Sequence, residues 1–213
     1  MRYSHIAFDL DGTLIDSMPI WRGTGETFLT RHHFPVPANL LDVVKSQTLY
    51  QSAEYFRDTL GVPMEPQAIV DEIIAYVEDA YRHTIPLKEG AKAYLEAMAE
   101  KGVKMCILTA SEASYILPAL DRLDIHKYFD CILTCTELGE YKEDGKAYLT
   151  AMEKLGGTLE DTVVFEDAGY AVKGAKAAGF TVYAVLDHSI RENEIEKIEK
   201  LADKCIRSYE ELL

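Results

Sequence analysis

Residues 6–17 read IAFDLDGTLIDS and join a short apolar run to two carboxylates, Asp9 and Asp11, that lie two positions apart. An isolated buried charge costs several kcal/mol, which is comparable to the net stability of a whole domain. Two neighbouring acids at the end of a buried segment are therefore expected only where positive charge lies beside them. Gly12 and Thr13 follow directly and are expected to form the turn after a strand.

The composition limits the size and the partners of the protein. The chain has 213 residues, 48% of them hydrophobic, which is enough for one main core and a smaller second domain. Its 36 acidic and 22 basic residues give a formal charge of -14, which disfavours nucleic acid and membrane surfaces as partners. The four cysteines lack CxxC spacing and the sequence has neither a signal peptide nor about 18 uncharged apolar residues in a row. We expect a soluble cytoplasmic monomer with reduced thiols.

Short apolar runs alternate with segments of helical periodicity along most of the chain. The runs are too brief for helices and several are rich in β-branched residues, so they predict parallel strands at 3–8, 103–108, 131–133, 162–165 and 181–185. Apolar spacings of three and four predict helices at 89–101, 112–123, 144–155 and 168–178. This alternation predicts an α/β fold with a doubly wound, Rossmann-like parallel sheet.

The first two predicted strands are separated by about ninety residues, whereas a simple crossover needs about thirty. The surplus predicts an inserted helical cap at residues 17–84, which leaves residues 1–16 and 85–213 for the α/β core. Helical patterns at 20–34, 49–60 and 69–81 support this, and four prolines mark the joins between them. The segment RENEIEKIEK, residues 191–200, is interpreted as a solvated helix.

Polar residues follow four of the predicted strands. Because ligands of a doubly wound sheet collect beyond the carboxyl ends of its strands, we expect these side chains to share one crevice. Such a set suits phosphoryl transfer, because Mg²⁺ prefers oxygen ligands and can join protein carboxylates to a substrate phosphate. The residues are Asp9, Asp11, Thr109, Ser111, Lys142, Glu166 and Asp167.

The two acids of the first segment are candidates for covalent and acid–base catalysis. With its charge partly neutralised by the metal, Asp9 can act as the nucleophile toward phosphorus. Asp11 can protonate the leaving alcohol and then deprotonate the water that cleaves the aspartyl phosphate. Glu166 and Asp167 are expected to hold the ion directly or through water.

The remaining candidates would bind the phosphate itself. Thr109, Ala110 and Ser111 lead into a predicted helix whose first amides can donate to phosphate oxygens. Lys142 would place a positive charge where the transferring group becomes most negative. On local grounds alone, Asp11 could be a turn former, Thr109 a helix cap and Lys142 a surface lysine.

With DxDGT[LV] at residues 9–14 and the other three motifs in order, the chain resembles the haloacid dehalogenase superfamily over nearly its whole length. It is similar to the branch with a helical cap, which holds β-phosphoglucomutases, phosphoglycolate phosphatases and sugar-phosphate phosphatases. The resemblance implies that Asp9 is the nucleophile and Asp11 the acid and base. It also implies that Mg²⁺ is bound by the Asp11 backbone carbonyl and by the Asp9 and Asp167 carboxylates.

The sequence departs from the family pattern at three places. Glu143 and Gly145 replace the two prolines of the lysine loop, which leaves that loop less stiff and makes Lys146 a rival to Lys142. Ala168 replaces a serine of the acidic motif, which removes only a supporting hydroxyl. Trp21 stands about where sugar phosphomutases of this branch carry a cap histidine, and its presence favours release of phosphate to water.

We therefore predict a magnesium-dependent phosphatase of a small phosphorylated metabolite, with a sugar phosphate favoured as substrate. In the cap, Trp21, Arg22 and Lys45 are weaker candidates for substrate contacts, as are Gln47 and Tyr50. A phosphomutase of the β-phosphoglucomutase type is the nearest alternative. A receiver-type or non-catalytic phosphate-binding regulatory protein is the alternative from another class, and metal-free dehalogenation ranks below it.

Overall fold

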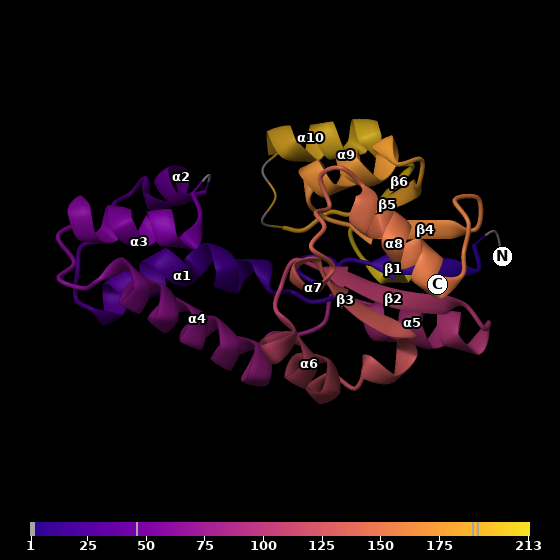
Figure 1. Cartoon of the computed structure of the whole chain (residues 1–213), viewed down its shortest axis with the longest axis horizontal. Helices are drawn as coiled ribbons and strands as arrows, with labels where there is room; N and C mark the ends of the chain where they lie inside the picture. Colours follow the sequence, from indigo (N-terminus) through magenta and orange to yellow (C-terminus); the bar gives the residue numbers. More distant parts are fainter. Residues whose placement is uncertain (1–2, 46, 189, 191) are drawn as a thin grey trace. The chain divides into compact units, whose positions relative to one another are not determined.

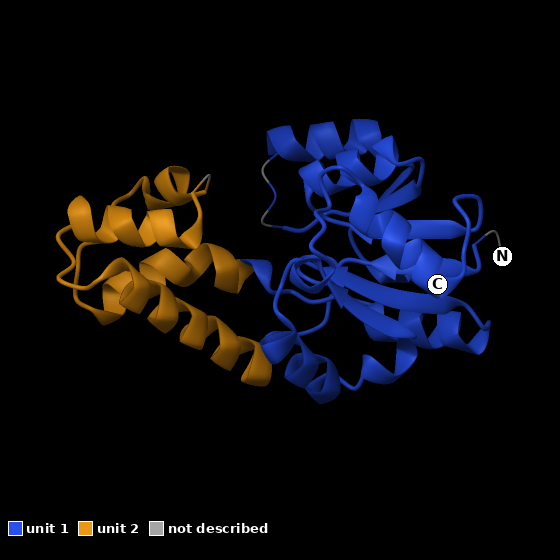
Figure 2. Cartoon of the chain, in the orientation of Figure 1, with its two compact units in different colours: residues 1–18, 85–213 blue, residues 19–84 orange. Residues whose placement is uncertain are grey.

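The computed structural model describes residues 3–45, 47–188, 190 and 192–213. The chain divides into two compact units, and Figure 2 shows them in different colours. Unit 1 comprises Met1–Met18 and Ile85–Leu213, and unit 2 comprises Pro19–Thr84.

Unit 1 is built on one sheet of six parallel strands in the order β3-β2-β1-β4-β5-β6 (Figure 1). The chain builds outward from β1 to β3, returns to the other side of β1 and continues to β6. A crevice therefore opens between β1 and β4, where the direction of winding reverses. The strands are β1 His5–Phe8, β2 Lys104–Thr109, β3 Cys131–Thr134, β4 Thr162–Glu166, β5 Thr181–Val185 and β6 Lys204–Ile206.

Helices cover both faces of the sheet, which confirms the predicted doubly wound α/β fold class. Figure 1 shows α5 (Ala91–Glu100) and α6 (Ala113–Arg122) on one face and α8 (Lys146–Leu155), α9 (Gly169–Ala177) and α10 (Glu192–Leu201) on the other. The sequence prediction missed β6 and three short helical segments of this unit. These are η1 His126–Tyr128, α7 Cys135–Leu138 and η2 Tyr209–Leu212.

The two faces of the sheet are packed differently. On the face under α8 and α9, small and aliphatic side chains such as Ala7, Leu108 and Val164 form the core. On the opposite face, Phe8 and Phe165 pack with Tyr94 and Tyr209 at ring-centroid distances of 4.9 to 6.4 Å. Buried apolar area of this kind is the main favourable term that fixes the strands in register.

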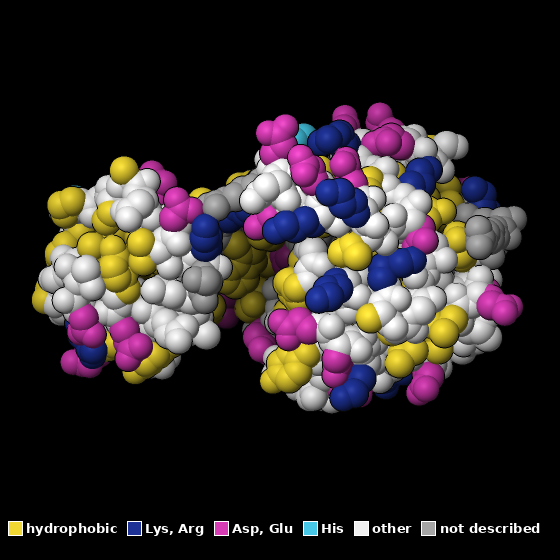
Figure 3. Space-filling model, turned by 90° about the horizontal axis from the view of Figure 1, so that it is seen from above, with side chains coloured by type: hydrophobic (Ala, Val, Ile, Leu, Met, Phe, Trp, Pro, Cys, Tyr) yellow, Lys and Arg dark blue, Asp and Glu magenta, His cyan; other side chains and the backbone are white. Residues whose placement is uncertain are grey.

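Charged side chains cover the outer surface over α10. Ile198 is the buried residue of this helix, and acidic and basic side chains occupy most of its other positions. Figure 3 shows lysine, arginine, aspartate and glutamate interspersed on this side of unit 1. The solvated helix predicted at 191–200 is present from Glu192, and Arg191 lies outside the described residues. Within the described chain, no helix is both long and apolar enough to cross a lipid bilayer.

The described residues of unit 2 form four helices with a core of their own. Phe28 and Phe56 stack at 5.8 Å in that core, and Leu29 and Ile69 are fully buried beside them. The Thr48 side chain accepts a hydrogen bond from the backbone of Gln51 and forms a capping box that starts the third helix. The helices are α1 Met18–Arg31, α2 Leu40–Val44, α3 Leu49–Asp58 and α4 Pro66–His83.

The two segments that lead to and from unit 2 are tied together inside unit 1. The Asp16 amide donates to the Pro86 carbonyl at 2.9 Å, and the Lys88 amide donates to the Leu14 carbonyl at 2.9 Å. The Lys88 ammonium also pairs with the Asp16 carboxylate at 2.8 Å and with the buried Asp187 carboxylate. One lysine therefore connects both segments to the loop that follows β5.

We expect Lys88→Met to destabilise the protein by about 3 kcal/mol, because the Asp187 carboxylate would lose its ammonium partner while staying buried. Urea denaturation followed by circular dichroism measures this change. Lys146→Met is the matched control, since Lys146 pairs with Asp144 at 3.0 Å on the surface. Equal denaturation midpoints for the two variants would contradict the assigned role of Lys88.

Candidate active site

The sheet register places the predicted site residues at one edge of unit 1. Phe8 of β1 is level with Ile107 of β2 and Phe165 of β4. Asp9 follows Phe8 and Glu166 follows Phe165, so these two acids lie side by side. Thr109 lies one position further along β2. Asp9, Thr109 and Glu166 are 5%, 0% and 1% exposed, respectively. Two acids and a hydroxyl thus lie at the reversal point of the sheet, where water is largely excluded.

Lys142 lies between the acids of two strands. Its ammonium donates to Asp9 Oδ1 and, at 2.6 Å, to Glu166 Oε1, and the residue is 4% exposed. Tyr148 donates to the same Glu166 oxygen at 2.8 Å, while the amides of Asp167 and Ala168 donate to Glu166 Oε2 at 3.0 and 3.1 Å. Both oxygens of Glu166 therefore accept hydrogen bonds, one from Lys142 and Tyr148 and the other from two backbone amides. Lys142 is buried, so its interpretation as a surface lysine is wrong.

Three buried carboxylates converge here. One oxygen from each of Asp9, Glu166 and Asp167 lies within 4.8 Å of the others. Asp9 Oδ2 is buried and has no hydrogen-bond partner among the described residues. A single buried ammonium therefore faces three carboxylates, and the unpartnered oxygen marks where a further cation would be stabilised.

Burial and like charge shift the protonation of this cluster. Burial, followed by the charge of Glu166, raises the pKa of Asp9 from an ordinary 3.8 to about 7, although Lys142 opposes the shift. Burial also raises the pKa of Asp167 well above its usual range, with the charge of Asp9 as the next cause. The neighbouring carboxylates hold the pKa of Lys142 above its ordinary value, so its ammonium stays charged. A divalent cation would reverse the shifts of the two acids.

Hydroxyl groups orient the second acid of the first segment. Ser17 donates to Asp11 Oδ1 at 2.6 Å, Ser111 donates to Asp11 Oδ2 at 2.6 Å, and Thr109 approaches the same oxygen at 3.5 Å. Thr109 Oγ1 also accepts from the Ser111 amide at 3.0 Å, whereas the residue at the N-cap of α6 is Glu112. Thr109 therefore organises the loop around Asp11 and does not cap the helix.

Gly12 allows the first loop to approach the acidic loop closely. Its φ of 82° lies in the left-handed region, and a Cβ at this position would come within 2.2 Å of Asp167 Oδ2. A side chain here would displace the Asp167 carboxylate from the cluster. The glycine of the DxDGT motif is thus required by the packing of Asp167.

The lysine loop is held by a glycine of α9. A Cβ on Gly174 would lie 2.0 Å from the Lys142 carbonyl oxygen and 2.8 Å from that of Glu143. Close backbone packing therefore fixes the loop where the two prolines of the family pattern are missing. The rival candidate, Lys146, is exposed and pairs with Asp144 outside the buried cluster.

One residue of the site and a neighbouring pocket were not predicted from the sequence. Ser17 was not among the predicted site residues, because a lone serine carries no signal until its contact with Asp11 is known. A pocket of about 380 Å³ lies beside Lys142 and is lined in part by Ala110, Tyr141 and Tyr170. A pocket of this size can accept a small metabolite.

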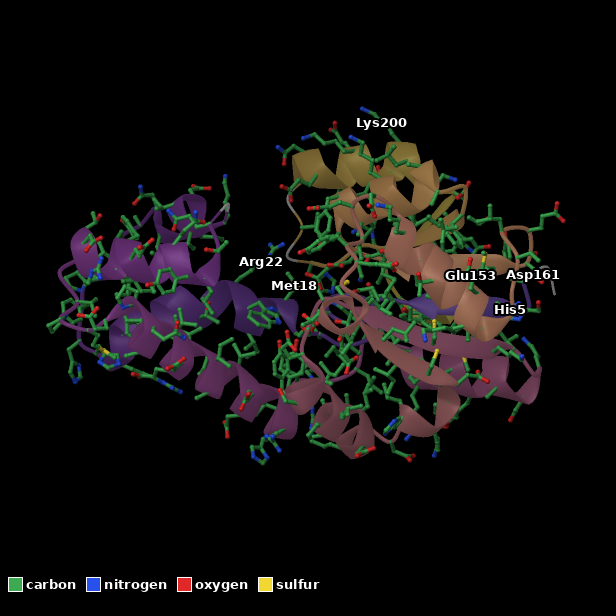
Figure 4. All side chains as sticks on the ribbon, in the orientation of Figure 1. His5, Met18, Arg22, Glu153, Asp161 and Lys200 are labelled. Atoms are coloured by element: carbon green, nitrogen blue, oxygen red, sulfur yellow. The ribbon has the colours of Figure 1, made fainter. Side chains whose placement is uncertain are left out.

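The cap candidates make contacts within unit 2. The Trp21 indole donates to the Tyr81 hydroxyl at 2.9 Å, and Lys45 pairs with Asp42 at 3.1 Å on the surface. Figure 4 labels Arg22 on α1, where it is partly exposed. The contacts of Trp21, Arg22 and Lys45 with substrate stay a prediction.

Comparison with known proteins identifies the class to which this fold and site belong. The profile of the haloacid dehalogenase-like hydrolases matches residues 6–185, and the chain belongs to that family. A phosphorylated carbohydrates phosphatase of Thermotoga maritima is 27% identical over 201 residues, which cover 89% of this chain and 88% of that protein. Phosphoglycolate phosphatase 1 of Pseudomonas aeruginosa is 30% identical over 182 residues, which cover 82% of this chain and 66% of that protein.

A solved structure shows the same fold. A Thermotoga maritima protein provisionally assigned as a β-phosphoglucomutase superposes with a TM-score of 0.85 and 23% identity, covering 99% of this chain and 96% of the other. The predicted family and the predicted class of enzyme, a phosphatase, are confirmed by these matches.

We expect Gly174→Ala to lower kcat/KM by about ten-fold or more, because the new methyl group would displace the Lys142 loop. Alanine is the better helix former by about 1 kcal/mol, so helix propensity alone predicts an unchanged or more stable enzyme. Steady-state kinetics and thermal unfolding measure both quantities. The control is Lys173→Ala at an exposed position of the same helix. Full activity of the Gly174→Ala variant would show that the loop does not depend on this contact.

The raised pKa of Asp9 predicts a pH dependence of stability in the presence of a chelator. Because the folded state binds this proton more tightly, the stabilisation is complete below about pH 4 and is lost as the pH rises through about 7. We expect the free energy of unfolding of the wild type to fall relative to that of Asp9→Asn over this range. Urea titrations at several pH values measure the difference, and a constant difference would contradict the assignment.

Proposed function

We propose that the protein is a magnesium-dependent phosphatase that hydrolyses a small phosphorylated metabolite, a sugar phosphate, through an aspartyl-phosphate intermediate. The observation that carries this proposal is the buried cluster of Asp9, Glu166 and Asp167 beside the Lys142 ammonium, in which Asp9 Oδ2 has no partner among the residues that the structure describes. A site with this excess of negative charge is suited to a metal ion and a substrate that the ion can neutralise.

The donor set fits Mg²⁺, because the cluster offers carboxylate oxygens in a buried site. The Asp9 and Asp167 carboxylates and the Asp11 backbone carbonyl would hold the ion, and Glu166 would contribute at most through water, because both of its oxygens already accept hydrogen bonds. When bound, the ion would neutralise charge on the phosphate and the carboxylates and so allow two anions to approach each other. The engaged oxygens of Glu166 favour its role in holding Lys142.

In the first half of the reaction, an Asp9 oxygen attacks phosphorus as the bond from phosphorus to the leaving oxygen breaks. The Asp11 carboxyl gives its proton to that leaving oxygen, which departs as an alcohol. Ser17 and Ser111 hold Asp11 by one hydrogen bond to each oxygen, so its orientation is fixed before substrate binds. The Lys142 ammonium stabilises the charge on the transferring group.

In the second half, Asp11 takes a proton from water, and the water oxygen attacks the phosphorus of the aspartyl phosphate. The bond between Asp9 and phosphorus breaks, which releases inorganic phosphate and restores the carboxylate. Thr109 ends β2, Ala110 and Ser111 follow it in the loop before α6, and all three would contact phosphate oxygens. The cycle returns both aspartates to their initial state.

Three lines support the substrate class. The 380 Å³ pocket beside Lys142 has room for the organic part of a small phosphate ester. The Thermotoga maritima relative is a phosphatase of phosphorylated carbohydrates, and the Pseudomonas aeruginosa relative is a phosphoglycolate phosphatase. We also infer that unit 2 supplies specificity, through Trp21, Arg22 and Lys45, and that the protein is a cytoplasmic monomer.

We expect phosphate release from one or more sugar phosphates in a panel that also contains phosphoglycolate, and we expect chelation of Mg²⁺ to abolish it. Asp9→Asn removes the nucleophile and should reduce the rate below detection, while Asp11→Asn should lower kcat by about 10²- to 10⁴-fold. Asp144→Asn, at an exposed carboxylate, is the control with normal activity. Inorganic phosphate is measured with a colorimetric assay.

Turnover that survives chelation or persists in Asp9→Asn would overturn the mechanism. Conversion of a sugar 1-phosphate to its 6-phosphate without free phosphate would establish the phosphomutase instead. Binding of phosphorylated compounds without turnover would favour a non-catalytic regulatory protein.

A further inference from the structure

Two cysteines that the proposed reaction does not use lie opposite each other in the sheet. Cys106 of β2 is paired in register with Cys131, the first residue of the edge strand β3. Both side chains belong to the face that packs against α8, where Cys106 is fully buried and Cys131 is partly exposed. The pair therefore joins a buried thiol to one that solvent can reach.

The spacing of the pair suits a covalent bond. Paired residues on neighbouring strands lie about 4.8 Å apart, and disulfide-bonded cysteines have Cα atoms about 4.4 to 6.8 Å apart. Each thiol lies close enough to the other to shift its pKa. Both cysteines are free thiols in this structure.

The two thiols differ in reactivity. The neighbouring Cys106 thiol lowers the pKa of Cys131 to about 7, and Lys154 of α8 adds to this while burial and Asp130 oppose it. The proximity of Cys131, together with burial, raises the pKa of Cys106 well above its usual range. At neutral pH a large fraction of Cys131 is thiolate, which is the nucleophilic form.

We propose that Cys131 and Cys106 form a peroxide-reactive dithiol that closes reversibly to a disulfide between β2 and β3. The Cys131 thiolate attacks one oxygen of hydrogen peroxide, the O–O bond breaks, and the departing hydroxide takes up a proton to become water. Cys106 sulfur then attacks the resulting sulfenic acid, its proton leaves with the hydroxyl group as a second water, and the S–S bond forms. Two thiols are oxidised, and one peroxide is reduced to two waters.

The other two cysteines lack this arrangement. Cys205 lies on β6 at the opposite edge of the sheet, opposite Ala184, and burial raises the pKa of its thiol. Burial likewise raises the pKa of Cys135, which lies in α7. Cys205 is thus a matched comparison for Cys131, because both are partly exposed cysteines on edge strands.

The test exposes the full, reduced chain to hydrogen peroxide, measures its intact mass, and then alkylates it under denaturing conditions for peptide mapping. We expect the intact mass to fall by two hydrogen atoms, peptide mapping to join the peptides of Cys106 and Cys131, and dithiothreitol to restore the thiols. At neutral pH, alkylation of native Cys131 should be on the order of ten-fold faster than that of Cys205. An unchanged mass, or a disulfide that uses Cys135 or Cys205, overturns the proposal.

Single substitutions separate the two roles. In Cys106→Ala, peroxide should leave Cys131 as a sulfenic acid that dimedone traps, because the second thiol is missing. In Cys131→Ser, the buried Cys106 should resist oxidation, and Cys205→Ser should form the disulfide as the wild type does. Equal oxidation of Cys106 with and without Cys131 would contradict the assigned order of attack. The wild-type protein alone shows whether the disulfide forms, so the proposal can be contradicted even if a variant folds poorly.

Discussion

The ammonium group of Lys142, shared by Asp9 and Glu166 in a buried crevice, is the interaction on which the site depends. A charge buried to this extent costs free energy unless it is paired, and here one cation faces three acids. Burial raises the pKa values of Asp9 and Asp167, and the charges of the neighbouring carboxylates add to the shifts. The excess negative charge therefore lowers the folding stability. Further positive charge in the cluster would offset this loss.

The fold supplies this geometry through backbone packing more than through side-chain contacts. The parallel register brings the ends of β1 and β4 together, and Gly12 and Gly174 let two loops approach closer than any other residue would permit. The first amides after β4 fix one oxygen of Glu166, which leaves the other for Lys142 and Tyr148. Because these constraints lie in the backbone, the lysine loop keeps its position although two prolines of the family pattern are replaced.

The sequence predicted the regular elements of unit 1 well, because buried parallel strands read as short apolar runs and the crossover helices have clear periodicity. It missed β6, whose three residues include an exposed lysine, and it missed α7, which spans four residues. The polar residues that follow the strands could be predicted from their positions in the sequence alone. The burial of Lys142 and the hydrogen bond from Ser17 to Asp11 could not, since both depend on segments that meet only in the folded chain.

The proposed catalytic residues all belong to unit 1, which separates the chemistry from the inserted helices. The two segments that lead to and from the insertion are joined by backbone hydrogen bonds and by the ion pair of Asp16 with Lys88. Lys88 also pairs with Asp187, so these segments are held within unit 1. Unit 2 has its own core, and Trp21 is already bonded to Tyr81 within it. Under the proposed function, substitutions in unit 2 could change substrate preference while Lys142 keeps its contacts with Asp9 and Glu166 inside unit 1.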